Sequence, residues 1–336
     1  MILSGTTTFT RSPIPGGHQV TRTTPLGRAT SYDLSTNLGG NEVRSDQLPS
    51  GLIRGRTRTR ADRFTTTAPD GTVTTTQMAP DPRFGMRSSF AELVTTQLPS
   101  GLTRTETMTR AATLGTPGDP FSIISSTETR SINGRTTTTS YNFGTRVETT
   151  TTPAGRVTSS LFDAQGKILQ IDPPDDASIF FSYDADGRLL STQQGTRTTM
   201  RTYGADGLLA TVTDPIDQLT AFARNVRGDV LSETRPDLEV TAFGYDGEGH
   251  TVEVTPPGKP THEMAFNAIE EMGSYTPPTI AQGNTQTQYT YDLDRNLDLV
   301  QQPGPRIVDY QYDFAGRLSA VTFPSGNIAR SYSPST

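Results

Sequence analysis

The sequence predicts an all-β protein built from tandem β-hairpins, and three observations support this fold class. A phrase of the form Tyr-Asp-x-x-Gly-Arg returns along the chain, as in FSYDADGRLLS (residues 181–191) and YQYDFAGRLSA (residues 310–320). Turn-forming residues are frequent, with 31 Gly and 24 Pro spread over 336 residues. Helical periodicity is scarce, and its best short candidate, residues 261–273, coincides with the repeat register instead.

The phrase recurs with a period of 20 or 21 residues, interrupted by one step of 25. Its anchor positions are Tyr141, Phe162, Tyr183, Tyr203, Arg224, Tyr245, Phe266, Tyr291, Tyr312 and Tyr332. In most units a Pro follows the anchor after 12 residues, so each unit contains two strands and two turns. We therefore expect every unit to be one β-hairpin in a repeat architecture.

The residue types of the first turn indicate its geometry. In residues 184–187 (DADG) the leading Asp can accept hydrogen bonds from the backbone, and the Gly can adopt a positive φ at the end of a type I turn. The same glycine slot contains Gly166, Gly207, Gly228, Gly249 and Gly316. Glu270 and Arg295 occupy this slot in two units, and there we expect an altered loop.

The second turn contains Pro, which fixes φ and has no N–H to donate to a strand ladder. Between the turns, the anchor and the residue two positions before it share one face of the strand. Those earlier residues are Phe181, Phe222, Phe243, Met264, Tyr289 and Tyr310, with Arg201 as the exception. We expect the two sets to form an aromatic ladder whose rungs lie roughly 10 Å apart.

Residues 1–140 keep the same kinds of turn but lose the regular spacing. Pro-x-Gly turns are expected at Pro25, Pro49, Pro69 and Pro99, and Thr/Arg alternations such as RGRTRTRADRFTTT (residues 54–67) lie between them. We interpret residues 1–140 as degenerate Thr/Arg-rich hairpins of the same sheet, and residues 141–336 as the regular repeat sheet. A Ser/Thr/Pro stalk that never folds is the alternative for the first part.

Composition limits the function. The net charge of −6, without a Lys/Arg-rich block, disfavours nucleic acid as a partner. The chain has no Cys, which excludes disulfides and thiolate metal sites. No apolar run approaches the roughly 20 residues of a membrane span, and the first residues lack the pattern of a secretory signal.

The histidines do not form a metal or catalytic pattern. His18, His250 and His262 share no short spacing, and His250 follows a turn glycine, as a solvated turn residue would. His262-Glu263 looks like half of a zinc-protease motif, but position 266 is Phe where a second His is required. We expect no metal site and no cofactor.

One carboxylate cluster, Asp172, Asp175 and Asp176, could support acid/base catalysis if burial separated the pKa values of its members. These residues surround a Pro turn, so exposed turn formers are the favoured interpretation. Asp184 and Asp186 resemble alternating calcium ligands, but no 12-residue loop with a distal Glu follows. The sequence therefore indicates a protein that is not an enzyme.

The phrases YDADGRLLS, YDFAGRLSAVTFPSG and FDAQGKILQ, the period and the Pro-x-Gly partner turns resemble the Rhs/YD-repeat family. This family includes bacterial Rhs and wall-associated polymorphic toxins, the C components of Tc toxins, and teneurins. The resemblance covers residues 141–336 specifically and continues more weakly over residues 1–140. It implies a curved sheet of hairpins that spirals into part of a hollow shell.

By this resemblance the site residues are structural turn and ladder residues, none of them catalytic. They are Tyr183, Asp184, Gly187, Arg188, Tyr203, Gly207, Gly228, Tyr245, Asp246, Gly249, Tyr291, Asp292, Tyr312, Asp313, Gly316 and Arg317. The family's C-terminal core motif, which releases a cargo, is not found, so we expect cargo and cleavage residues elsewhere in a longer parent polypeptide. The chain would then be a fragment, secreted or on a bacterial cell surface, with its export signal elsewhere.

The resemblance implies that the shell segment encloses a toxin or effector cargo. The alternative is a cell-surface adhesion or carbohydrate-binding module, in which Tyr289 and Tyr310 would contact glycans or a cell-surface receptor. An enzyme acting on polysaccharide, with the cluster at Asp172 as its site, ranks third. Open sheet edges would favour self-association of the chain, which light scattering would detect.

Overall fold

The computed structural model describes residues 5–59, 61–278 and 286–332, and within them contains 29 β-strands and no helix. The chain divides into two compact units. Unit 1 comprises Met1–Thr8, Arg22–Ala29 and Arg197–Tyr332, and unit 2 comprises Phe9–Thr21, Thr30–Thr196 and Ser333–Thr336. In the described ranges no helix has the length and apolar character that a membrane crossing requires.

The strands that precede Arg197 are β1 (Thr8–Ile14), β2 (Gly17–Thr23), β3 (Ala29–Thr36), β4 (Glu42–Gln47), β5 (Ile53–Arg58), β6 (Arg63–Thr67), β7 (Val73–Asp81), β8 (Gly85–Gln97), β9 (Thr103–Leu114), β10 (Ile123–Ile132), β11 (Arg135–Asn142), β12 (Val147–Thr151), β13 (Val157–Phe162), β14 (Ile168–Asp172), β15 (Ile179–Tyr183) and β16 (Leu189–Gln194). From β3 to β16 each strand pairs antiparallel with the next.

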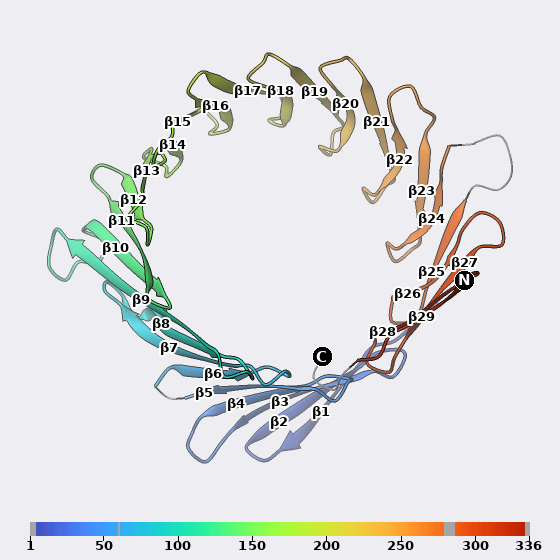
Figure 1. The fold of residues 1–336 in the computed structure, drawn as a ribbon, viewed down its shortest axis with the longest axis horizontal. Coiled ribbons are helices and arrows are strands. Elements are labelled where there is room, and N and C mark those ends of the chain that lie inside the picture. Colours follow the sequence, from blue (N-terminus) through green and yellow to red (C-terminus); the bar gives the residue numbers. More distant parts are fainter. Residues whose placement is uncertain (1–4, 60, 279–285, 333–336) are drawn as a thin grey trace. The chain divides into compact units, whose positions relative to one another are not determined.

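The strands that follow are β17 (Arg197–Tyr203), β18 (Leu209–Thr213), β19 (Leu219–Arg224), β20 (Val230–Thr234), β21 (Val240–Tyr245), β22 (Thr251–Thr255), β23 (His262–Phe266), β24 (Met272–Thr276), β25 (Thr287–Tyr291), β26 (Leu297–Gln301), β27 (Ile307–Tyr312), β28 (Leu318–Phe323) and β29 (Gly326–Ala329). They too pair antiparallel in chain order. Figure 1 shows each of these two runs as a curved sheet. The predicted all-β class and its tandem hairpins are confirmed.

The turns explain the period of the repeat. β18 has 5 residues and β19 has 6. Each is followed by a five-residue turn, residues 214–218 after β18 and 225–229 after β19, in which the first N–H donates to the last carbonyl. Two strands and two such turns together make one 21-residue unit. The strands are shorter than the seven to nine residues that a simple division of the unit predicts, because the turns take more of it.

The expected Pro turns in residues 1–140 adopt this same five-residue form. In Thr24–Arg28, Leu48–Leu52, Ala68–Thr72 and Leu98–Leu102 the first N–H donates to the last carbonyl at 2.8 to 3.0 Å. The division of the chain at residues 140 and 141 stays a prediction. Pro278 follows the anchor Phe266 by 12 residues, so a Pro turn is expected there as well, but residues 279–285 lie outside the described residues.

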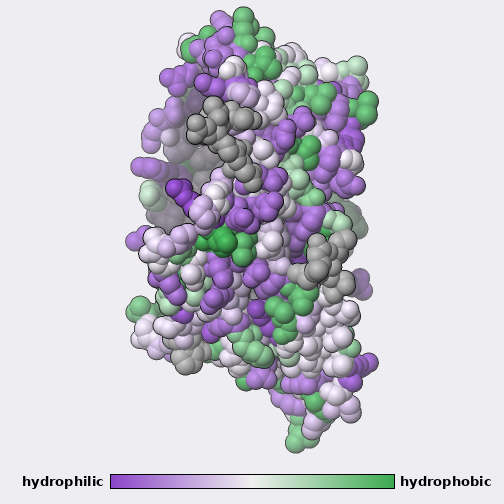
Figure 2. All heavy atoms as spheres, turned by 90° about the vertical axis from the view of Figure 1, so that its right-hand side faces the viewer, coloured by the Kyte–Doolittle hydropathy of each residue, from purple (hydrophilic) through white to green (hydrophobic). Residues whose placement is uncertain are grey.

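The sheet has very little core. In the described part, the buried hydrophobic side chains are Ala79, Phe90, Val300 and Ala320. The accessible surface is 21091 Å², whereas a compact protein of this mass would expose about 13,000 Å². On the face shown in Figure 2, hydrophobic residues are scattered among hydrophilic ones. Neighbouring-strand contacts and turn hydrogen bonds must therefore carry the stability, as in other repeat proteins.

The expectation of altered loops at Glu270 and Arg295 is wrong. Both residues adopt a positive φ, 65° and 70°, close to the 82° of Gly187 in the same slot. Their turns also keep the hydrogen bond from the first N–H to the last carbonyl, at 2.8 Å in each case. The longer step of the repeat arises instead in the connection between β24 and β25, on the side of the Pro turns.

Candidate functional site: the row of YD turns

The candidate site residues lie in turns that follow anchor positions, here called the YD turns: residues 163–167 and 184–188 in unit 2, and 204–208, 225–229, 246–250, 267–271, 292–296 and 313–317 in unit 1. Asp184 shows how the sequence forms one of them. Its Oδ1 accepts the N–H groups of Asp186 at 3.0 Å and Arg188 at 2.8 Å, while its Oδ2 accepts the guanidinium of Arg188 at 2.7 Å. The carboxylate therefore closes the turn from within.

Other YD turns preserve this closure with different side chains. Asp313 binds Arg317 through both backbone and guanidinium, and Asp246 binds His250 through backbone and ring. In the turn that begins with Asn225, the side-chain bond between the first and fifth residues runs in the opposite direction, because Asn225 Nδ2 donates to the Asp229 carboxylate at 2.9 Å. Asn225 Oδ1 still accepts the turn's N–H groups. In these turns an acceptor at the first position is matched by a complementary group at the fifth, whereas the turn 204–208 begins with Gly204 and forms the backbone bond to the Leu208 carbonyl, at 2.9 Å, without a side-chain acceptor there.

The anchor tyrosines connect consecutive hairpins. The hydroxyl of Tyr312 donates to the carbonyl of Leu297 at 2.8 Å, and the hydroxyl of Tyr245 donates to the carbonyl of Val230 at 2.9 Å. β26 and β27 pair only from Leu299 onward, so the Leu297 carbonyl lies beyond the strand ladder. The tyrosine satisfies this carbonyl at the point where the strands separate.

The same bond recurs through the repeat. Its other pairs are Tyr183 with Ile168, Tyr291 with Met272, and Tyr332 with Leu318, at 2.7 to 3.0 Å. Arg224 occupies an anchor position and makes the equivalent contact, donating from Nε to the carbonyl of Leu209 at 3.2 Å. Burial raises the pKa of Tyr291 and Tyr312, which keeps these phenols protonated as donors.

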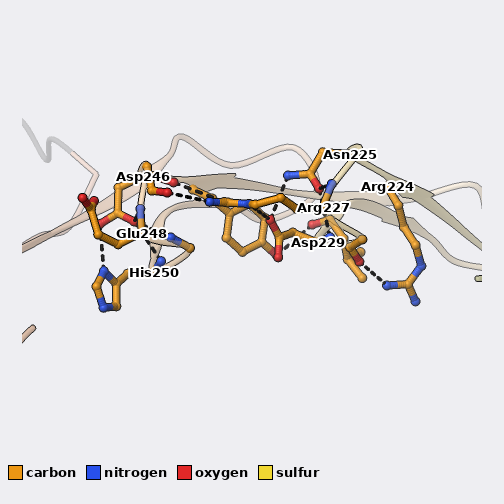
Figure 3. A network of polar contacts seen from close by, with 12 residues as sticks. Arg224, Asn225, Arg227, Asp229, Asp246, Glu248 and His250 are labelled. Atoms are coloured by element: carbon orange, nitrogen blue, oxygen red, sulfur yellow. Dashed lines mark hydrogen bonds and ion pairs between the residues drawn. The ribbon is translucent and has the colours of Figure 1, made fainter.

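Side chains also connect neighbouring turns. Arg227 donates to the carbonyls of Gly247 at 2.8 Å and Asp246 at 3.2 Å in the following turn, while its Nε donates to Asp229 in its own turn. Figure 3 shows Arg227 lying between the two turns, with His250 and its partner Asp246 beyond it. Arg295 reaches the preceding turn, where it donates to Glu271 at 2.9 Å and to the carbonyl of Ile269.

A segment distant in sequence closes over one YD turn of unit 1. The turn Thr24–Arg28 lies against Asp294, whose Oδ2 accepts the Thr24 hydroxyl at 2.8 Å and the Arg28 guanidinium at 2.6 Å. The N–H of Leu26 donates to the other carboxylate oxygen at 3.1 Å. The Asp294 side chain is 6% exposed as a result, whereas Asp186, at the same turn position, is 72% exposed.

The sequence model of the teneurin YD-shell family matches residues 52–336. The chain belongs to this family. The matched range begins well before residue 141, so it includes much of the part in which the repeat register is irregular. The comparison with curated proteins finds no match.

The solved structures to which this chain is similar include several Tc toxin structures. They include "Crystal Structure of TcdB2-TccC3-Cdc42" (10% identity, TM-score 0.48, covering 98% of this chain and 21% of that chain) and "Crystal Structure of TcdB2-TccC3 without hypervariable C-terminal region" (14%, 0.49, 90% and 20%). The Tc holotoxin pore of Photorhabdus luminescens is similar as well (13%, 0.44, 91% and 22%). The YD-shell chain thus spans about a fifth of the length of these chains.

The structure changes the interpretation of two residues of this YD-shell chain, His250 and Asp172, which were expected to be solvent-exposed turn residues. His250 is not a free turn residue, because its Nδ1 is 2.9 Å from the Asp246 carboxylate and its ring stacks on Phe266 at 4.5 Å. Asp172 is half-buried and accepts hydrogen bonds from Ser178, Gln170 and Ser159, which lower its pKa. It stabilises a turn between strands, and the exposed position expected for it is wrong.

The YD turns use their charged groups to stabilise one another, which is a structural role for a shell. Carboxylates accept backbone N–H groups and pair with neighbouring cations, so these groups are already engaged. No group of three or more His, Asp or Glu side chains in the described ranges is arranged to hold a metal ion. The Tyr, Asp, Gly and Arg positions of the repeat phrase remain proposed structural site residues.

Sequence reasoning missed two features of the YD-shell chain. The contact of Thr24–Arg28 with Asp294 joins residues 266 to 270 positions apart, and no repeat period predicts it. The tyrosine hydroxyl bonds could have been anticipated, because a buried phenol needs an acceptor and the anchor is Tyr in most units. These anchors are linked to the preceding hairpin through hydroxyl-to-carbonyl bonds, and the aromatic ladder stays a prediction.

The carboxylates of the YD turns predict that the folded chain loses stability at acid pH. The N–H of Arg188 lowers the pKa of Asp184; for Asp313, burial alone would raise the pKa, but the hydrogen bonds from Arg317 outweigh it and the pKa falls. A pKa below the unfolded value of about 3.9 stabilises the fold above that pH, and the contribution is lost as pH falls through the folded pKa. We expect the urea midpoint of unfolding to be steady from pH 7 to 5 and to drop below about pH 4.

The control for this pH series is Asp313→Asn. Asparagine is the first residue of two other YD turns, at Asn225 and Asn267, where its side-chain oxygen accepts a backbone N–H. The variant therefore keeps an acceptor at the first turn position and removes a titrating group. Its urea midpoint should depend less on pH than that of the unmodified chain. An equally steep acid transition in the variant would show that Asp313 does not contribute to it.

Proposed function

We propose that this chain is a non-catalytic wall segment of a YD-shell that encloses a toxin or effector cargo belonging to the same parent polypeptide. The observation that carries the proposal is the cross-linking of consecutive hairpins, by tyrosine hydroxyls and by side chains such as Arg227, along a sheet with almost no core. Such a sheet can be large and thin, as an enclosing wall requires. Membership of the YD-shell family supports the same role.

Enclosure also accounts for the exposed apolar side chains. Phe121, Ile216 and Phe314 are 82%, 71% and 71% exposed. Exposed apolar surface of this kind is a site for partners or for aggregation. We propose that the parent polypeptide and its cargo cover part of it, and that the protein is secreted or displayed on a bacterial surface. Self-association of the isolated chain through open edges stays a prediction.

The test uses the complete parent polypeptide, with trypsin as the probe. The part that follows residue 336 should resist cleavage while the sheet is folded, and should be cleaved rapidly when the same part is produced alone. Gly249→Val, which weakens a YD turn, should expose it, whereas Asp186→Ala, at an exposed turn position, should leave it protected. Equal cleavage of that part in the intact parent and in isolation would refute enclosure.

Adhesion through carbohydrate is the second candidate, and one groove favours it. Two YD turns of unit 1 flank a hollow of 430 Å³ lined by Tyr289, Tyr291, Asn267 and Arg295 among others. Aromatic and amide side chains suit the binding of sugars. The double variant Tyr289→Ala with Tyr310→Ala should then abolish attachment to cells while the chain still unfolds cooperatively, and unchanged attachment would exclude this candidate.

A further inference from the structure

Two neighbouring strands of unit 2, β4 and β5, place arginines on one face. In β4 and β5, Arg44 lies directly opposite Arg56, and Asp46 lies opposite Arg54. Residues opposite each other in an antiparallel pair share a face, so Arg44, Arg54 and Arg56 point to the same side. β6 continues this face with Thr66 opposite Arg56. The Arg-x-Arg-x-Arg pattern of β5 is thus one row of guanidinium groups.

This arrangement is electrostatically unfavourable for the chain alone. Like charges directly opposite each other on neighbouring strands destabilise a sheet. Arg44 has a carboxylate partner, Glu42, at 2.9 Å. Among the residues that the structure describes, Arg54 and Arg56 form no ion pair, and Arg56 lies instead over the ring of Phe64 at 4.8 Å. Two guanidinium groups are therefore left for an external anion.

The arginines surround a hollow large enough for an organic ligand. Its volume is 710 Å³, and its lining includes Arg44, Asp46, Arg54, Arg56, Phe64 and Thr66. The arginines are exposed, so a ligand can reach them from solvent. Guanidinium forks bind carboxylate or sulfate groups through paired hydrogen bonds.

We propose that this hollow, here called the arginine hollow, binds an acidic oligosaccharide whose sugars carry carboxylate or sulfate groups. Arg54 and Arg56 would bind the anionic groups. Asp46 and the hydroxyl of Thr66 can accept hydrogen bonds from sugar hydroxyls, a contact that a purely anionic ligand could not offer Asp46. Tyr32, opposite Asp46 and 41% exposed, provides a ring on which a sugar can stack.

An acidic peptide fits the arginine hollow less well. β4, β5 and β6 each pair on both sides, so their backbone groups are not open to a strand-like peptide. Consecutive carboxylates would also meet Asp46 and Glu42. The site is independent of cargo enclosure and lies on different strands from the groove at Tyr289, so failure of one proposal leaves the other standing.

The test is calorimetric titration of the purified chain with hyaluronan hexasaccharide, chondroitin sulfate hexasaccharide, maltohexaose and hexaglutamate. We expect the two acidic sugars to bind at least tenfold more tightly than maltohexaose or hexaglutamate. Both acidic sugars carry carboxylates and only chondroitin sulfate also carries sulfates, so the ratio between them measures what sulfate adds to binding. Tighter binding of hexaglutamate, or no binding of either acidic sugar, would overturn the proposal.

Variants separate binding from folding. Arg54→Gln with Arg56→Gln should weaken binding of the acidic sugars at least tenfold, because the anionic groups lose both guanidinium partners. Without ligand the double variant should melt no more than about 2 °C below the unmodified chain, since removing one of two opposed cations relieves repulsion. Arg63→Gln, an exposed arginine on the opposite face of β6, is the matched control and should bind normally. Equal loss of binding in the control would overturn the assignment.

Discussion

Replacing Asp294 with alanine is expected to release the turn Thr24–Arg28 from the YD turn that it covers. The carboxylate accepts three hydrogen bonds, from the Thr24 hydroxyl, the Leu26 N–H and the Arg28 guanidinium. The Arg28 side chain is only 11% exposed and would lose this partner. Removing the nearer carboxylate of a well-buried charged group destabilises by about 2 to 3 kcal/mol, because Arg28 then keeps only the more distant Asp292, at 3.9 Å, as its carboxylate partner.

Hydrogen exchange is the appropriate measurement, since unfolding of a repeat sheet need not be two-state. Exchange of the Leu26 amide should accelerate by roughly 30- to 160-fold in the variant, as expected for a local loss of about 2 to 3 kcal/mol. Asp186→Ala changes the same turn position where the side chain is 72% exposed. This control should leave exchange in residues 22–29 unchanged. An unaltered Leu26 amide in Asp294→Ala would show that the contact does not hold the turn.

Two substitutions at the glycine slot of YD turns, Gly249→Ala and Glu270→Gly, are expected to change hairpin stability in opposite directions. Gly249 has a φ of 99°, beyond the left-handed region that L-residues reach, so Gly249→Ala should destabilise its hairpin by about 2 kcal/mol. Glu270 has a φ of 65°, and Glu270→Gly should stabilise its hairpin by about 1 kcal/mol, because glycine adopts this conformation without a Cβ penalty.

The two variants are measured side by side by urea unfolding and by exchange of the amides in β21 to β24. Each serves as the control for the other, because the turns share the same hydrogen bonds and differ in φ. The φ value, and not the identity of the native residue, then decides the sign of the effect. Destabilisation in both variants would mean that the glycine slot is governed by side-chain contacts instead.

The properties of neighbouring residues were sufficient to predict the hairpins of the regular repeat. The repeat phrase predicted hairpins, and the Asp and Gly of residues 184–187 predicted a closed type I turn, because these signals act over four or five residues. The same rules failed at Glu270 and Arg295. Their turns form without glycine because Asn267 and Asp292 already close them with hydrogen bonds to the backbone, which offsets the strain of a positive φ.

By itself, the sequence determined the all-β class, the period of the hairpins, the turns of the regular repeat and the four Pro turns before residue 141. It did so because strand alternation and turn chemistry are properties of neighbouring residues. Only the tertiary structure decided which groups meet across repeats: the tyrosine hydroxyls with carbonyls of the preceding hairpin, Arg227 with the next turn, Asp294 with a turn about 270 residues away, and Arg44 with Arg56. These contacts depend on strand register and sheet curvature, which the sequence of a single repeat does not determine.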